Sequence, residues 1–77
     1  MNAKEATFRM LDRILLYLKT HAFFEFDGKF LQIQAKAYSP DLHYPSTYLR
    51  YMREYRQSHD CKITCINKRK SLYRMER

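Results

Sequence analysis

Residues 44–56, YPSTYLRYMREYR, decide how the rest of the chain is interpreted. At 100° per residue, the apolar and aromatic side chains of this stretch gather on one side of a helix: Tyr48, Leu49, Met52 and Tyr55. The opposite side is polar and carries Ser46, Thr47, Arg50, Arg53, Glu54 and Gln57, with Tyr51 on the flank. Proline is tolerated in the first turn of a helix. The pattern predicts an amphipathic helix over Pro45–Ser58 whose apolar side belongs to a core.

The segment that follows this helix, CKITCINKRKSLYRMER, predicts a β-hairpin. Two strands, Lys62–Asn67 and Ser71–Met75, flank a tip formed by Lys68, Arg69 and Lys70. The tip has no glycine, so Asn67 is the candidate for any position that needs a positive φ.

Two cysteines lie at the start of this hairpin. Alternation along a strand places Cys61, Ile63 and Cys65 on one face, which indicates core. The Cα atoms of Cys61 and Cys65 would lie about 13 Å apart at 3.3 Å per residue, which is too far for a disulfide. A zinc site needs more ligands than this segment and His59 supply, so we expect buried free thiols and no metal.

The N-terminal third predicts a helix and a short strand. Asn2 and Glu5 have the spacing of a capping box. Apolar residues then recur at helical spacing, which predicts a helix over Ala3–Thr20: Leu11, Ile14, Leu15, Leu18 and Ala22. A strand over Phe23–Phe26 follows. We expect this part to be scaffold.

The middle segment has two interpretations. Asp27 is a good N-cap for a helix over Gly28–Tyr38, and this interpretation is favoured because glutamine, alanine and lysine are helix formers. Alternatively, Asp27-Gly28 is the turn of a β-hairpin over residues 23–37. Either element stops at Ser39-Pro40 because proline cannot continue a helix. Leu42 is expected to plug the following loop.

The charge is unevenly distributed along the chain. Residues 1–49 carry six Lys/Arg against five Asp/Glu, whereas residues 50–77 carry nine against three. A basic half of this kind favours a polyanionic partner, and nucleic acid is the commonest one in a cell. A basic protein without such a partner stays open. The 77-residue length indicates one domain. No segment is typical of a membrane span or a signal peptide, so we expect a soluble, cytoplasmic protein.

The order helix, strand, helix, helix, hairpin resembles the winged helix-turn-helix family over about residues 5–75. PSTYLRYMREYR is similar to the recognition helix of many prokaryotic members, and Tyr73-Arg74-Met75 after a basic turn resembles the last strand of a wing. The resemblance implies an α+β fold, a single winged-helix domain over residues 1–77, and sequence-specific binding of double-stranded DNA. It implies a small transcriptional or replication regulator, nucleoid-associated, of a kind that mobile elements encode.

The resemblance also assigns roles to individual residues. It places Ser46, Thr47 and Arg50 in the major groove, with Arg50 bidentate to guanine. Arg53 and Gln57 then meet phosphate or the groove wall. Tyr44 and Tyr51 either donate hydroxyls to phosphates or pack on the helix flanks. The three residues of the tip, Lys68, Arg69 and Lys70, follow phosphates or enter a minor groove, or are simply solvated.

Two other functions compete with DNA binding. A basic, tyrosine-rich face suits a protein-interaction module that docks an acidic partner. A hairpin over residues 23–37 would instead give an RNA-binding α-β-β-α-β-β domain whose Phe24, Phe26 and Phe30 stack bases. A homodimer through Tyr17, Phe23 or Phe24 is compatible with the DNA-binding interpretation. The scattered His21, His43 and His59 form no catalytic pattern, so we expect no enzyme activity and no cofactor.

Overall fold

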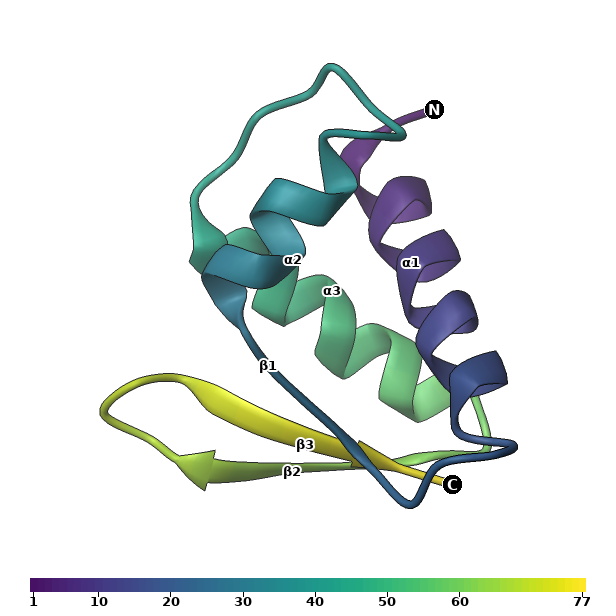
Figure 1. Ribbon diagram of the computed structural model, residues 1–77. Coiled ribbons are helices and arrows are strands. Elements are labelled where there is room, and N and C mark those ends of the chain that lie inside the picture. Colours follow the sequence, from purple (N-terminus) through teal and green to yellow (C-terminus); the bar gives the residue numbers. More distant parts are fainter.

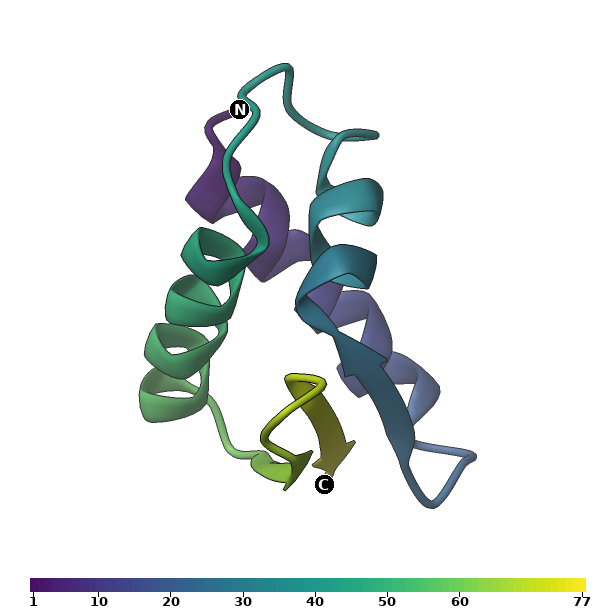
Figure 2. The ribbon, with the colours of Figure 1, turned by 90° about the vertical axis from the view of Figure 1, so that its left-hand side faces the viewer.

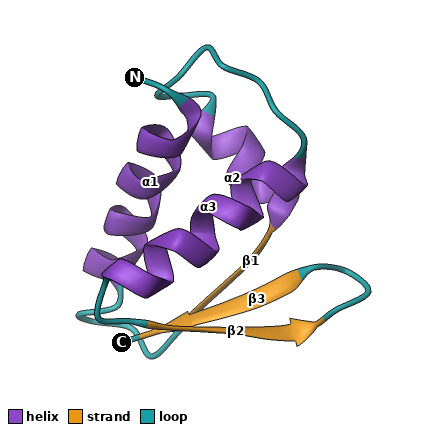
Figure 3. Ribbon diagram, turned by 180° about the vertical axis from the view of Figure 1, so that it is seen from behind, coloured by secondary structure: helices purple, strands orange, loops and turns teal.

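Three helices cover one face of a three-stranded antiparallel sheet in the computed structural model, which describes residues 1–77 (Figure 3). The elements follow one another as α1 (Ala3–Tyr17), β1 (Phe24–Asp27), α2 (Gly28–Ala35), α3 (Pro45–Ser58), β2 (Lys62–Asn67) and β3 (Leu72–Glu76). The chain is therefore a small α+β fold. The predicted element order is confirmed, and the predicted bounds of α3 and β2 agree with the structure.

The sheet joins distant parts of the sequence, because its strand order is β1-β3-β2. Phe24 pairs with Met75, which pairs on its other side with Ile63. Met75, Ile63 and Phe26 are buried under the helices, as alternation along each strand requires. On the outer face, Arg74 Nε donates to Glu25 Oε2 at 2.9 Å. The short strand β1 thus ties the C-terminal hairpin to the start of α2.

The three helices pack against one another around a core that includes Leu11, Leu31 and Met52. The tightest approach is between the starts of α2 and α3. A Cβ added at Gly28 would lie 3.1 Å from Leu49 Cδ1 and 3.1 Å from Pro45 Cβ. Any side chain at this position would therefore have to displace Leu49 or Pro45 by a few tenths of an ångström, so glycine favours this close approach. Figure 1 shows both starts at the left of the molecule, with the β2–β3 turn projecting from the same side.

The segment with two interpretations is a helix. Asp27 is its N-cap, and its carboxylate accepts from the Phe30 amide at 2.8 Å. The alternative hairpin over residues 23–37 is therefore wrong. Its base-stacking sheet is absent as well, because Phe26 is buried and Phe30 lies on α2.

Helices α1 and α2 both end earlier than predicted. The predictions were Thr20 and Tyr38, whereas the structure ends them at Tyr17 and Ala35. Each helix tightens into i→i+3 bonds: Thr20 N donates to Tyr17 O at 3.2 Å, and Tyr38 N donates to Ala35 O at 3.0 Å. Past the end of α1, Ala22 is exposed and does not belong to its apolar stripe. Strands β1 and β3 each lie one residue later than predicted.

Polar contacts, not an apolar plug, hold the loop between α2 and α3. Leu42 is 61% exposed, so its predicted role is wrong. The hydroxyl of buried Tyr48 donates to Asp41 O and accepts from the His43 amide, both at 3.3 Å. Gln32 Nε2 donates to His43 O at 2.7 Å. These bonds satisfy backbone groups of Asp41 and His43, while the side chain of Leu42 is left in solvent.

Candidate nucleic-acid interface

Helix α3 has the two faces that its sequence predicts. Tyr48, Leu49, Met52 and Tyr55 are all buried. An exposed row lies opposite them, and we call it the α3 stripe: Ser46, Arg50, Arg53 and Gln57. Thr47 and Tyr51 are half-buried on one flank of the stripe. The structure therefore gathers four of the nine predicted site residues in one solvent-facing row.

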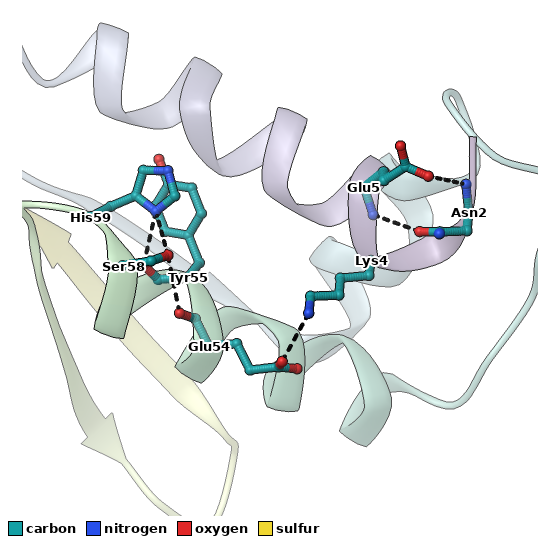
Figure 4. Close-up of polar contacts among 7 residues, drawn as sticks. All are labelled: Asn2, Lys4, Glu5, Glu54, Tyr55, Ser58 and His59. Atoms are coloured by element: carbon teal, nitrogen blue, oxygen red, sulfur yellow. Dashed lines mark hydrogen bonds and ion pairs between the residues drawn. The ribbon is translucent and has the colours of Figure 1, made fainter.

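Acidic side chains do not neutralise the stripe. Glu54, its nearest carboxylate along the helix, pairs with Lys4 Nζ of α1 at 3.0 Å (Figure 4). No ion pair forms at Arg50 or Arg53 in the chain. The Arg50 guanidinium instead lies 5.4 Å from the centroid of the Tyr51 ring, where the negative face of the aromatic ring favours a cation. Both arginines thus retain their charge for a partner.

Helix α3 is held rigidly at its C-terminal half, which fixes the orientation of the stripe. The hydroxyl of Tyr55 donates to Asp12 Oδ1 of α1 at 2.7 Å. Its ring stacks on His59 with centroids 3.7 Å apart, and Phe8 meets it edge-on at 5.2 Å. Burial and the bond to Asp12 raise the pKa of the Tyr55 hydroxyl well above its usual range. His59 Nδ1 lies 3.0 Å from the Tyr55 carbonyl oxygen and 2.9 Å from Ser58 Oγ (Figure 4).

One basic residue of α3 serves the fold and not the stripe. Arg56 donates from a guanidinium nitrogen to Ile63 O of β2 at 3.0 Å. This bond ties the end of α3 to the first strand of the hairpin. The stripe and the hairpin are therefore connected through this bond as well as through the chain.

The basic tip of the hairpin is exposed at Lys68, Arg69 and Lys70. The prediction of a positive φ at Asn67 is wrong, because Ser71 takes that conformation with φ 51°. Ser71 is the last residue of the four-residue turn, and the side chain of Asn67 accepts from the Lys70 amide at 3.1 Å. The turn closes with Ser71 N donating to Lys68 O at 3.2 Å.

The tip of the hairpin and the start of α3 border the same shallow hollow. This hollow of about 280 Å³ is lined by Asp27, Gly28, Lys29, Pro45, Ser46, Leu49, Lys70 and Ser71. Figure 2, which looks at the molecule from this side, shows the hairpin turn between α3 and the β1–α2 junction. The first residue of the stripe and the last lysine of the tip therefore face one region. Lys29 belongs to the same region and was not among the predicted site residues.

Not every predicted residue joins this surface. Thr47 lines a different hollow on the other flank of α3, together with Gln32, Leu42, His43 and Tyr44. Tyr44 is the N-cap residue of α3, but its side chain is 82% exposed and makes no capping hydrogen bond. Tyr51 packs edge-on against Tyr48, with ring centroids 6.5 Å apart, which agrees with the alternative of a ring packed on the flank.

The prediction of two buried thiols is wrong for Cys65. Cys65 is exposed and Cys61 is half-buried, and both are free. Cys65 does share a face of β2 with the buried Ile63, but it pairs with Tyr73, nearer the tip of the hairpin. Burial, aided by the charge of Asp60, raises the pKa of the Cys61 thiol. No three His, Cys, Asp or Glu side chains come close enough together to hold a metal ion.

The aromatic residues near the end of α1 are partly exposed. Tyr17 is 42% and Phe23 is 48% exposed, and Tyr17 meets Phe24 edge-on with centroids 5.7 Å apart.

None of the helices has the length and apolar character that a membrane span needs.

Comparisons of the chain with protein-family models, with curated proteins and with solved structures found no match.

Proposed function

We propose that the protein is a winged helix that binds double-stranded DNA in a sequence-specific manner through α3 and the hairpin tip. The observation that carries this proposal is the common hollow of Ser46 and Lys70. It brings the first turn of an amphipathic helix next to a tribasic turn on one rigid surface. The element order and the strand order β1-β3-β2 support it, because they provide a helix to read and a hairpin to act as wing.

The chemistry of the stripe fits the major groove, which is about 12 Å wide and admits one helix. Arg50 is exposed, unpaired and central, and a guanidinium presents two parallel donors that match the O6 and N7 acceptors of guanine. Ser46 and Thr47 lie one turn earlier, and Arg53 and Gln57 one and two turns later. Guanine recognition is thus assigned to Arg50, with phosphate or groove-wall contacts from Arg53 and Gln57.

The tip supplies contacts that are independent of sequence. Lys68, Arg69 and Lys70 with Arg53 give about four phosphate contacts, which predicts a slope of log K against log salt of about −3.6. Such contacts fix the position of the protein on the duplex but do not discriminate among sites. A regulator of transcription or replication, of the small kind that mobile elements encode, is the role that this combination serves.

An electrophoretic shift assay across salt concentrations tests the proposal. Wild-type protein should bind duplex and lose affinity steeply with salt. On a selected site, Arg50→Ala should cost about 1–3 kcal/mol of discrimination, while Arg9→Ala on the outer face of α1 is the matched control. No wild-type binding at 50 mM salt, or equal losses for the two variants, would remove the proposal.

A second candidate function is a protein-interaction module. The exposed Leu42 and Tyr44 favour it, because both border a hollow of about 410 Å³ beside α3 and tyrosine is enriched at binding hot spots. An acidic protein partner would meet this flank and the arginines of the stripe. Nuclease treatment separates the two functions: a complex with such a protein survives it, while a nucleic-acid tether does not.

A further inference from the structure

We infer that Lys29 of α2 and Lys70 of the hairpin tip together hold one backbone phosphate of the duplex, in the hollow that they share with Ser46. This inference rests on the proposed DNA binding and adds to it a contact outside α3 and the tip. Lys29 is exposed and, like Lys70, forms no ion pair within the chain. The hollow of about 280 Å³ is therefore lined by two lysines that form no ion pair and by Ser46.

The three walls of this hollow are fixed relative to one another. Asp27 pairs with Leu72 in the sheet, which ties the start of α2 to the root of the hairpin. Gly28 is in close contact with Pro45 and Leu49, which ties α2 to the first turn of α3. The backbone around the hollow is thus ordered before a ligand binds, so the binding free energy of a phosphate is not reduced by an entropy cost for ordering it.

Asp27 is the one acidic group on the hollow. One of its carboxylate oxygens caps α2 through the Phe30 amide, at 2.8 Å, so the residue has a structural reason to be there. With Asp27, the two lysines leave the hollow with a net positive charge, so it suits an anion better than a cation or an apolar group. The hollow borders Ser46 at one end of the α3 stripe and Lys70 of the tip, so the backbone of a duplex on that surface passes it.

Two substitutions change the charge of the hollow in opposite directions. Lys29→Ala removes a cation, while Asp27→Asn removes the anion and keeps a side chain that caps helices equally well. Lys36→Ala is the matched control, because Lys36 is an exposed lysine just beyond the other end of α2. Circular dichroism checks that all three variants fold.

The test measures duplex affinity against salt for wild type and the three variants. Lys29→Ala should weaken binding about fivefold to tenfold at 0.1 M salt, equally on specific and random sequences, and should make the salt slope shallower by at most about 0.9, because Lys70 still contacts the same phosphate. Asp27→Asn should strengthen binding about twofold. Lys36→Ala should change neither the affinity nor the slope by as much.

Several outcomes would overturn the inference. Equal effects of Lys29→Ala and Lys36→Ala on duplex affinity would show that only the net charge of the protein matters. An unchanged affinity in Asp27→Asn would place the phosphate elsewhere. Either result leaves the proposed function standing. Loss of all wild-type binding rejects both. Displacement of the duplex by millimolar inorganic phosphate, beyond that caused by chloride at equal ionic strength, would assign the hollow to the free anion instead.

Discussion

Removal of the Tyr55 hydroxyl should cost little stability at neutral pH and nothing at pH 11. Tyr55→Phe keeps the ring between Phe8 and His59 and deletes the bond to Asp12. A hydrogen bond to a charged group contributes more than the typical 0.5–1.5 kcal/mol. The carboxylate of Asp12 is 60% exposed, however, so water replaces the lost donor and the expected cost at pH 8 is about 1 kcal/mol.

The pH dependence follows from the raised pKa of Tyr55. The native state holds the phenol proton, while an unfolded tyrosine loses it above about pH 10. The contribution of this proton to stability is therefore complete below pH 10 and is lost as the pH rises further. At pH 11, ionisation of an unfolded tyrosine stabilises the unfolded chain by about 1.4 kcal/mol. Tyr55→Phe lacks this term, so its deficit should vanish between pH 10 and pH 11, and at pH 11 the variant should be about 0.4 kcal/mol more stable than the wild type.

Urea denaturation followed by circular dichroism at pH 8, 9, 10 and 11 measures both proteins. All other titrating groups are common to the pair, so they cancel in the difference. The expected deficit corresponds to a melting temperature about 4–8 °C lower at pH 8. Tyr44→Phe is the control, since Tyr44 is 82% exposed and its hydroxyl should matter at no pH. A deficit that stays constant from pH 8 to pH 11 would refute the reasoning.

Three further predictions concern the cap, the helix contact and the thiols. Asn2→Ala removes the N-cap of α1 and should cost about 1 kcal/mol in a urea titration, and an unchanged midpoint would contradict the cap. Gly28→Val forces a branched side chain against Leu49 and should cost about 1–3 kcal/mol by the same measurement, whereas Gly28→Val with full stability would show that the helices can separate. Iodoacetamide at pH 8 should label the exposed Cys65 before Cys61, whose pKa is raised; mass spectrometry of peptides would reveal the reverse order.

The sequence predicts those features that local interactions determine. The capping box of Asn2 and Glu5, the N-cap Asp27 and the two faces of α3 all appear in the structure as expected. Each depends on residues within one or two helical turns, so the spacing along the chain carries the information. Helix ends were less predictable. The side chains of Thr20 and His21 both reach the Tyr17 carbonyl, and such competition for backbone groups leaves no periodic signal.

Features that depend on distant residues escaped prediction. Lys29 is unremarkable in the sequence, and it joins the surface only because β1 pairs with β3 and Gly28 lets α2 approach α3. Cys65 alternates correctly with Ile63, yet it is exposed while Ile63 is buried. The periodicity of a strand predicts which face a side chain occupies. Whether another element covers that face is set by tertiary packing.

The buried and the exposed rows of α3 consist of different residues, so the effects of a substitution on binding and on stability can be measured separately in this small protein. A chain of 77 residues has little stability to lose, so a residue that served both the core and a partner could not be changed without unfolding the domain. The buried and exposed rows of α3 share no residue, and Glu54, which could have bridged them, is paired with Lys4 instead. Substitutions in the stripe should therefore change binding while the melting temperature stays constant. An Arg50→Ala variant that loses binding can then be interpreted as the loss of a contact.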